Sequence, residues 1–176
     1  MQFPELETSR LILNKLSKSD GQALLDIFTD ENVVRYYDID VFNSEKQSLE
    51  LIDFFNQRFA DKVGVRWAIR VKSSGKLIGT CGFNSINLKM KNAGIGYELS
   101  SKYWGLGYAC EAVNTILQFA FSNDQPLGEL YRIQGDIMIG NTASESVLKK
   151  LGFKEEGIRR SSGFWKNEFH DLKCFG

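Results

Sequence analysis

The sequence predicts a mixed α/β domain, on the basis of three observations. Apolar residues recur at helical spacing in four segments, and short runs rich in β-branched and aromatic residues lie between them. Two of these runs, residues 66–71 and 76–83, are joined by a Ser-Ser-Gly turn, which is typical of an antiparallel hairpin. The 176 residues contain no linker, repeat or low-complexity segment, so we expect one domain over residues 1–176.

The expected elements follow in the order strand, helix, helix, hairpin, strand, helix, strand, helix and a final strand pair. The strands lie at residues 10–16, 66–71, 76–83, 93–99 and 131–139, and the tail 153–176 is expected to form two short strands around Lys166 and Asn167. The helices are expected to begin after Ser19, after Ser44, at about Tyr108 and after Asn141. The second helix has the clearest start, because Ser44 and Gln47 have the spacing of a capping box.

Composition and charge narrow the possible partners. Lys plus Arg number 22 and Asp plus Glu number 22, so no general attraction to nucleic acid is expected. The sequence shows neither a long apolar span nor a basic-then-apolar leader, which predicts no membrane partner and a cytoplasmic location. Three cysteines without CxxC spacing and a single histidine argue against a zinc site, and no metal is expected.

The stretch SSKYWGLGYACEA, residues 100–112, carries the main chemical signal. A strand that ends near Leu99, a loop through Gly105 and Gly107, and a helix that starts at about Tyr108 leave backbone N–H groups unpaired at a helix N-terminus. The two glycines put no side chain between these amides and an oxyanion, which suits a phosphate or pyrophosphate. A Walker loop is excluded because no Gly-Lys-Ser/Thr string is present, and the dinucleotide fingerprint is disfavoured because Cys110 stands at its third position.

Two longer blocks place this loop in a family context. YELSSKYWGLGYACEA followed by NTASESVLKKLGF (residues 141–153) resembles the GNAT superfamily of acetyl-coenzyme A dependent N-acetyltransferases. TSRLILNKL (residues 8–16) and WKNEFHDLKCF (residues 165–175) resemble the two ends of its RimJ/RimL branch, whose named members acetylate the N-termini of ribosomal proteins. The resemblance implies an α/β fold with a central, twisted, mostly antiparallel mixed sheet that is splayed at the cofactor site and flanked by about four helices.

The resemblance also implies which residues hold acetyl-coenzyme A. The backbone amides that would surround the pyrophosphate belong to Trp104, Gly105, Leu106, Gly107, Tyr108 and Ala109. Leu99 would pair its backbone with the pantetheine amides where two parallel strands splay. Asn141 would hydrogen-bond the pantetheine arm, which is compatible with a second role as a helix N-cap. Ser144 would approach the thioester sulfur, although a solvent-facing helix serine is an equally good interpretation of the sequence alone.

The catalytic groups are less completely indicated. Many superfamily members place a tyrosine at the position of Leu148 to protonate the leaving thiolate, and leucine has no proton to donate. The proton is therefore expected from Ser144, with Tyr103, Tyr108 or water as alternatives. Glu98 is the expected general base, because it lies on the strand that flanks the cofactor. The alternative for Glu98 is an outward-facing strand carboxylate.

Other residues could line a groove for the acceptor or belong to the core. The aromatic candidates are Tyr36, Tyr37, Phe42, Trp67, Phe83 and Trp165, most of which are expected in the core because a chain with 12% aromatic residues must bury them. His170 and Asp171 are adjacent on an expected strand, so their side chains should point to opposite faces and not form a dyad.

The sequence thus predicts an enzyme that moves acetyl from acetyl-coenzyme A to a primary amine. A protein N-terminal α-amine of the ribosomal-protein type is the expected acceptor, and a polyamine, amino acid or aminoglycoside is the alternative. An acyl-coenzyme A binding module without catalysis is a further alternative, since Leu148 lacks a proton to donate. The sequence does not set the oligomeric state, and a homodimer is kept open beside a monomer.

Overall fold

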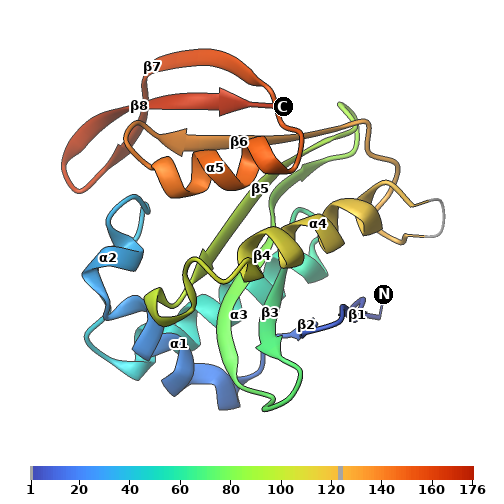
Figure 1. Ribbon diagram of the computed structural model, residues 1–176, viewed down its shortest axis with the longest axis vertical. Helices are drawn as coiled ribbons and strands as arrows, with labels where there is room; N and C mark the ends of the chain where they lie inside the picture. Colours follow the sequence, from blue (N-terminus) through green and yellow to red (C-terminus); the bar gives the residue numbers. More distant parts are fainter. Residues whose placement is uncertain (1, 123–124) are drawn as a thin grey trace.

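The computed structural model describes residues 2–122 and 125–176, and its centre is an eight-stranded sheet (Figure 1). The strands are β1 (Leu6–Glu7), β2 (Leu11–Lys15), β3 (Val65–Val71), β4 (Leu77–Asn87), β5 (Asn92–Leu99), β6 (Arg132–Met138), β7 (Glu155–Trp165) and β8 (Glu168–Phe175). The helices are α1 (Gly21–Phe28), α2 (Glu31–Val34), α3 (Glu45–Ala60), α4 (Tyr108–Ala120) and α5 (Thr142–Lys150). The spatial order of the strands is β1-β2-β3-β4-β5-β6-β8-β7.

The sheet divides between β5 and β6. These two strands are parallel and pair only from Asn92 to Gly94, against residues 132–134. Beyond that point β5 stays antiparallel to β4 up to Leu99, whereas β6 pairs with β8 from Gly135 to Met138. The two halves of the sheet therefore diverge, as the ribbon shows (Figure 1). This confirms the expected mixed, mostly antiparallel sheet with a splay.

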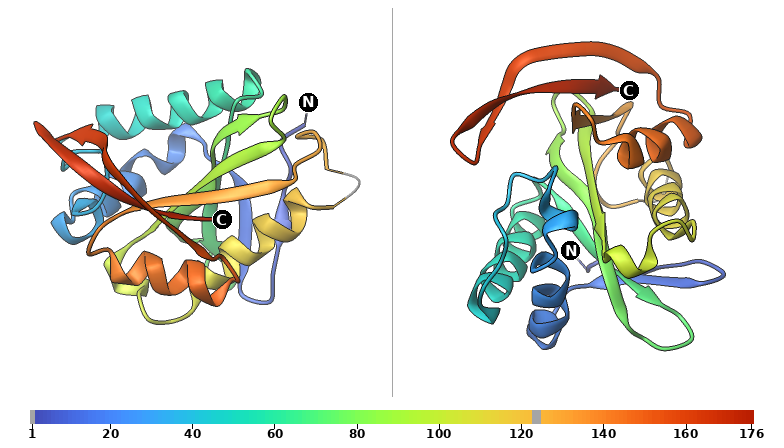
Figure 2. Two further views of the ribbon diagram at one scale, coloured as in Figure 1. Left: turned by 90° about the horizontal axis from the view of Figure 1, so that it is seen from above. Right: turned by 60° about the vertical axis from the view of Figure 1, so that its left-hand side comes forward.

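Helices cover both faces of the sheet (Figure 2). On one face, α4 buries Ala112, Val113 and Ile116 in a core that also contains the fully buried Trp67. On the other face, α1 and α3 enclose a second core. Because burial of a large apolar side chain is worth roughly 1.5–3 kcal/mol, the apolar stripes of these helices fix them to the sheet.

Several elements match the local sequence signals closely. The capping box at the start of α3 is present, and the Ser44 backbone N–H donates to Gln47 Oε1 at 3.2 Å. The hairpin between β7 and β8 turns at Lys166 and Asn167, which have φ values of 52° and 59°. Positive φ at both central residues matches the twist of the flanking strands in a two-residue hairpin.

Other expectations need correction. The first helix is not capped by Ser19, because a 3₁₀ turn from Lys18 to Asp20 precedes it and Ser17 caps that turn. The last two strands are not short, at 11 and 8 residues. The short elements β1 and α2 were not predicted, since two and four residues are too few to show a periodic pattern. In the described ranges, the helices are all too short or too polar to cross a membrane.

Candidate active site

The glycine loop between β5 and α4 presents a run of free backbone amides. Gly105 and Gly107 have φ values of 75° and 81°, and Gly107 is the N-cap of α4. From residue 105 to residue 110, the backbone N–H groups donate to no acceptor in the described part of the chain. The amide of Trp104 is not part of this run, because it donates to the Ser101 carbonyl at 3.2 Å. Six unpaired amides in the loop and first turn of a thirteen-residue helix are the donors that an anion site requires.

Contacts from the start of the chain hold this loop in place. Arg10 Nη1 donates to the Leu106 carbonyl at 3.0 Å, and Arg10 Nε donates to Glu111 Oε2 at 2.7 Å. Thr8 Oγ1 donates to the other carboxylate oxygen of Glu111 at 2.5 Å. Partial burial raises the pKa of Glu111, but the hydrogen bonds from Thr8 and Arg10 lower it by more, so this pKa lies below its ordinary value. Glu111 therefore serves the fold by tying α4 to the segment between β1 and β2.

A cavity of about 240 Å³ opens at the splay between β5 and β6. Its lining includes Tyr97, Asn141, Ser144 and Leu148. Leu99 is the last residue of β5 and is not among the residues that line the cavity. The N–H of the next residue, 100, donates to β4, so the Leu99 backbone groups face the open edge toward β6. The Leu99 carbonyl accepts a hydrogen bond from Trp104 Nε1 at 2.9 Å.

Helix α5 and its N-cap bring the side chains of Asn141, Ser144 and Leu148 to this cavity. Asn141 Oδ1 accepts from the Ser144 backbone N–H at 3.2 Å, so the expected N-cap role is confirmed. The Tyr97 hydroxyl donates to the Ser144 carbonyl at 3.1 Å, and burial raises the pKa of Tyr97 above its ordinary value. Leu148 is fully buried behind them.

Tyr97 is a candidate proton donor that the sequence reasoning missed. It lies two residues before Leu99, so the two share one face of β5, and that spacing could have identified it. The alternatives expected from the sequence lie elsewhere. Tyr103 and Tyr108 pack edge to face with ring centroids 6.1 Å apart, and neither lines the splay cavity.

Glu98 lies in a buried polar network rather than on the cavity wall. Its side chain is 3% exposed and forms an ion pair with Arg66, which is 1% exposed. Thr80 Oγ1 donates to Glu98 Oε1, and Tyr37 Oη donates to Glu98 Oε2 at 3.1 Å. Arg66 Nη2 also donates to Tyr37 Oη at 3.0 Å. Glu98 does not line the cavity, whereas Tyr37 does, so the tyrosine hydroxyl links the carboxylate directly to the cavity; a second link runs through Arg66 to the cavity-lining Asn84.

The aromatic candidates divide between the cavity and the core. Tyr36, Tyr37 and Trp165 line the splay cavity, whereas the other three are buried core residues. His170 stacks on Trp165 with centroids 4.4 Å apart, and Asp171 Oδ1 accepts from a backbone N–H of β7 at 2.7 Å. These separate contacts confirm that His170 and Asp171 do not pair.

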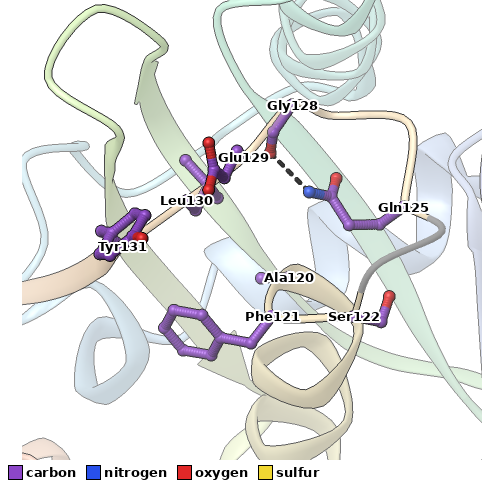
Figure 3. A pocket seen from close by; sticks show the side chains of 8 residues that line it. All are labelled: Ala120, Phe121, Ser122, Gln125, Gly128, Glu129, Leu130 and Tyr131. Carbon is purple, nitrogen blue, oxygen red and sulfur yellow. Dashed lines mark hydrogen bonds between the residues drawn. The ribbon is translucent and has the colours of Figure 1, made fainter.

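A second hollow, of about 560 Å³, lies at the far end of α4 (Figure 3). Figure 3 shows Phe121 and Tyr131 on its walls and a hydrogen bond from Gln125 to the Gly128 carbonyl. Its charged side chain, Glu129, is ion-paired with Lys91. None of the site residues predicted from the sequence lines this hollow, whereas Asn141 and Ser144 line the splay cavity together with the hydroxyl groups of Tyr36, Tyr37 and Tyr97. The splay cavity is therefore the candidate active site.

Comparison with known proteins agrees with this geometry. Residues 10–154 match the model of the acetyltransferase (GNAT) domain family. The chain is 37% identical over 173 residues to the uncharacterized N-acetyltransferase YoaA of Bacillus subtilis, a match that spans 98% of this chain and 96% of YoaA.

Two solved structures share the fold. An acetyltransferase of Salmonella typhimurium, described as modifying the N-terminal serine of a 50S ribosomal subunit protein, superimposes with a TM-score of 0.86 at 18% identity, covering 98% of this chain and 97% of that one. The self-immunity acetyltransferase MccE, solved with acetyl-CoA and AMP, gives a TM-score of 0.85 at 20% identity over 96% and 92% of the chains. With the family match and the YoaA relative, these findings show that the chain belongs to the GNAT family of acetyltransferases.

Proposed function

We propose that this acetyltransferase transfers the acetyl group of acetyl-coenzyme A to the α-amine at a protein N-terminus, as in the RimJ/RimL branch. N-acetyl transfer from acetyl-coenzyme A is the activity of the family to which the chain belongs. The acceptor is supported by the likeness over almost the whole chain to the Salmonella enzyme, which modifies a protein N-terminal serine. A small amine is the second candidate acceptor.

The observation that carries the proposed binding of acetyl-coenzyme A, the acetyl donor, is the run of free backbone amides in the glycine loop. The amides from residue 105 to residue 110 fit the pyrophosphate of coenzyme A, since none of them donates to an acceptor in the described part of the chain, and the Arg10 guanidinium beside Gly107 adds a positive charge there. The backbone of β5 at Leu99, which is not paired with β6, and the cavity-lining cap residue Asn141 would hold the pantetheine arm. Bound acetyl-coenzyme A supplies a thioester, which is already activated toward an amine.

The chain must then position the amine and move two protons. The amine proton would pass to Tyr37 Oη as the tyrosine proton passes to Glu98, because these two groups are already hydrogen-bonded. The amine nitrogen forms its bond to the acetyl carbon while the carbon–sulfur bond breaks. Ser144 would donate its hydroxyl proton to the sulfur that leaves, since it lines the cavity beside Asn141. Water in the open cavity would then return a proton to Ser144, and the proton held by Glu98 would leave through Tyr37 to water, which restores both groups.

Replacing Ser144 with alanine should lower kcat by about ten- to a hundredfold, with a smaller effect on the affinity for acetyl-coenzyme A. The hydroxyl is needed only when charge develops on sulfur, so the transition state loses more than the ground state. Steady-state kinetics and calorimetric titration with coenzyme A measure the two quantities. A Ser144→Ala enzyme of full speed would move the role to Tyr97 or water, and Tyr97→Phe would then separate these two.

Removing the hydroxyl of Tyr37 should lower kcat/KM by about tenfold, most strongly at low pH. Fewer amine molecules arrive neutral at low pH, so the loss should shrink as the pH rises. Tyr37→Phe is a cleaner test than Glu98→Gln, because the latter would leave Arg66 buried without its counter-charge. The pH–rate profiles of wild type and Tyr37→Phe are the measurement, and parallel profiles of equal height would remove Tyr37 and Glu98 from the proton path.

An acceptor screen tests the proposed substrate class directly. Release of coenzyme A would be followed with tripeptide amides that begin with Ser, Ala or Met, and with spermidine, free amino acids and an aminoglycoside. The highest kcat/KM is expected for a peptide α-amine. N-acetylated copies of the same peptides serve as controls for hydrolysis. A clear preference for spermidine or an aminoglycoside would replace the proposed acceptor by the second candidate.

A further inference from the structure

Asp38 occupies a position between two cavities that the catalytic proposal does not use. Tyr37, Asp38 and Asn84 line the splay cavity and also a second cavity of about 400 Å³ that lies beside α3. They form the wall where the two spaces meet. Asp38 is exposed, and no hydrogen bond or ion pair to it occurs within residues 2–122 and 125–176. It is therefore a carboxylate available to a ligand.

The charges at the splay favour a cation beside Asp38. The lining of the splay cavity contains two carboxylates and neither lysine nor arginine. The second carboxylate, Asp136, is ion-paired with Arg159, so Asp38 is the one without a partner in the described chain. The aromatic rings of Tyr36, Tyr37 and Trp165 line the same cavity. One face of Tyr36 carries the Arg35 guanidinium and one face of Trp165 carries His170, so the attraction of aromatic faces for a ligand cation is a secondary contribution beside Asp38.

The second cavity has the opposite character. Phe54 and Phe55 line it with other apolar side chains, and two arginines, Arg58 and the ion-paired Arg66, are also part of its lining. Arg58 donates to the carbonyls of Val63 and Asn84 and forms no ion pair with a carboxylate in the described ranges, so its positive charge is not neutralised there. An apolar group fits this space, whereas a second ammonium would meet both apolar surface and a like charge.

We infer that Asp38 binds the ammonium of the acceptor and that the cavity beside α3 receives the apolar side chain of the acceptor's first residue. The inference rests on the proposed α-amine acceptor and makes it more specific. A peptide α-amine carries one ammonium with a side chain one carbon away, which matches a single carboxylate next to an apolar space. A polyamine carries further ammonium groups and does not match. Asp38 is thus a specificity-determining residue, while Tyr37 beside it receives the proton.

The first test compares Asp38→Asn with Asp40→Asn. Asp40 is also exposed but lines neither cavity, so it is a matched control for charge removal in the same loop. With Leu-Ala-Gly amide as acceptor, Asp38→Asn should raise the KM for the peptide by about tenfold and leave kcat and the KM for acetyl-coenzyme A within about twofold. Asp40→Asn should match wild type. An unchanged peptide KM in Asp38→Asn would overturn the inference.

The second test uses binding without turnover. Leu-Ala-Gly amide and Lys-Ala-Gly amide would be titrated by calorimetry into wild type saturated with coenzyme A, and the leucine peptide should bind about five- to tenfold more tightly. Equal binding, or tighter binding of the lysine peptide, would overturn the role of the second cavity. If spermidine proves to be the substrate, the proposed acceptor fails, and the spermidine KM of Asp38→Asn then shows whether Asp38 holds an ammonium at all.

Discussion

The Gly107→Val variant should bind acetyl-coenzyme A at least about a hundredfold more weakly than wild type. Gly107 has a φ of 81° and caps α4, and a β-branched residue strongly disfavours that left-handed conformation. The loop would relax to another conformation and carry its amides away from the pyrophosphate. Each charge-assisted hydrogen bond is worth roughly 1.5–3 kcal/mol, so the loss of two accounts for a factor of this size.

Gly75→Val provides the matched control for this experiment. Gly75 lies in the β3–β4 turn with a φ of 68°, and a Cβ there would meet nothing within 4 Å. It therefore introduces the same kind of backbone strain outside the amide loop. Calorimetric titration with coenzyme A, beside circular dichroism, should show normal affinity in Gly75→Val and weak binding in a folded Gly107→Val. Wild-type affinity in folded Gly107→Val would refute the amide loop as the pyrophosphate site.

Replacing Arg66 with methionine should lower the free energy of unfolding by about 3–5 kcal/mol. Arg66 and Glu98 are almost fully buried against each other, and removal of the guanidinium leaves the carboxylate in the core without its counter-charge. A loss of free energy of this size exceeds what the loss of the arginine's apolar contacts alone would give, because methionine retains much of the volume of the arginine side chain. Urea unfolding measures the change.

Two further variants separate the buried charge from simple repacking. Arg66→Met combined with Glu98→Leu should regain much of the lost stability, since no unpaired charge then remains. Arg132→Met removes an ion pair with Glu156 in which both side chains are 42% exposed, and it should change stability by less than about 1 kcal/mol. If the double variant were as unstable as the single one, the cost would come from lost packing and not from the stranded carboxylate.

The sequence predicted the helices, strands and turns better than it predicted the buried polar network behind the cavity. The capping box at Ser44 and the turn at Lys166 depend on residues close in sequence, so the pattern alone located them. The glycine loop was found for the same reason. The Trp104 amide was wrongly expected to be free, because the tight turn that pairs it with Ser101 leaves no distinctive pattern.

The partners of Glu98 could not be read from spacing. Arg66 is 32 positions away on β3 and is brought to Glu98 by the sheet register, whereas Tyr37 is 61 positions away in the loop after α2 and is brought there by the packing of that loop. An arginine within an apolar strand was a signal that its charge must be matched, but not by which carboxylate. Asp38 was missed because a lone aspartate in a loop is indistinguishable from a solvated one until the cavities around it are known.

The hydrogen bonds between Arg10 and Glu111 make the conformation of the glycine loop depend on residues that are distant in the sequence. The two residues are 101 positions apart, and Arg10 also holds the Leu106 carbonyl. Closure of so long a segment carries a cost in conformational entropy that a local turn does not. The shape of the glycine loop is therefore set by contacts between distant parts of the chain, and we expect a substitution at Arg10 to alter the loop although it lies far from it in sequence.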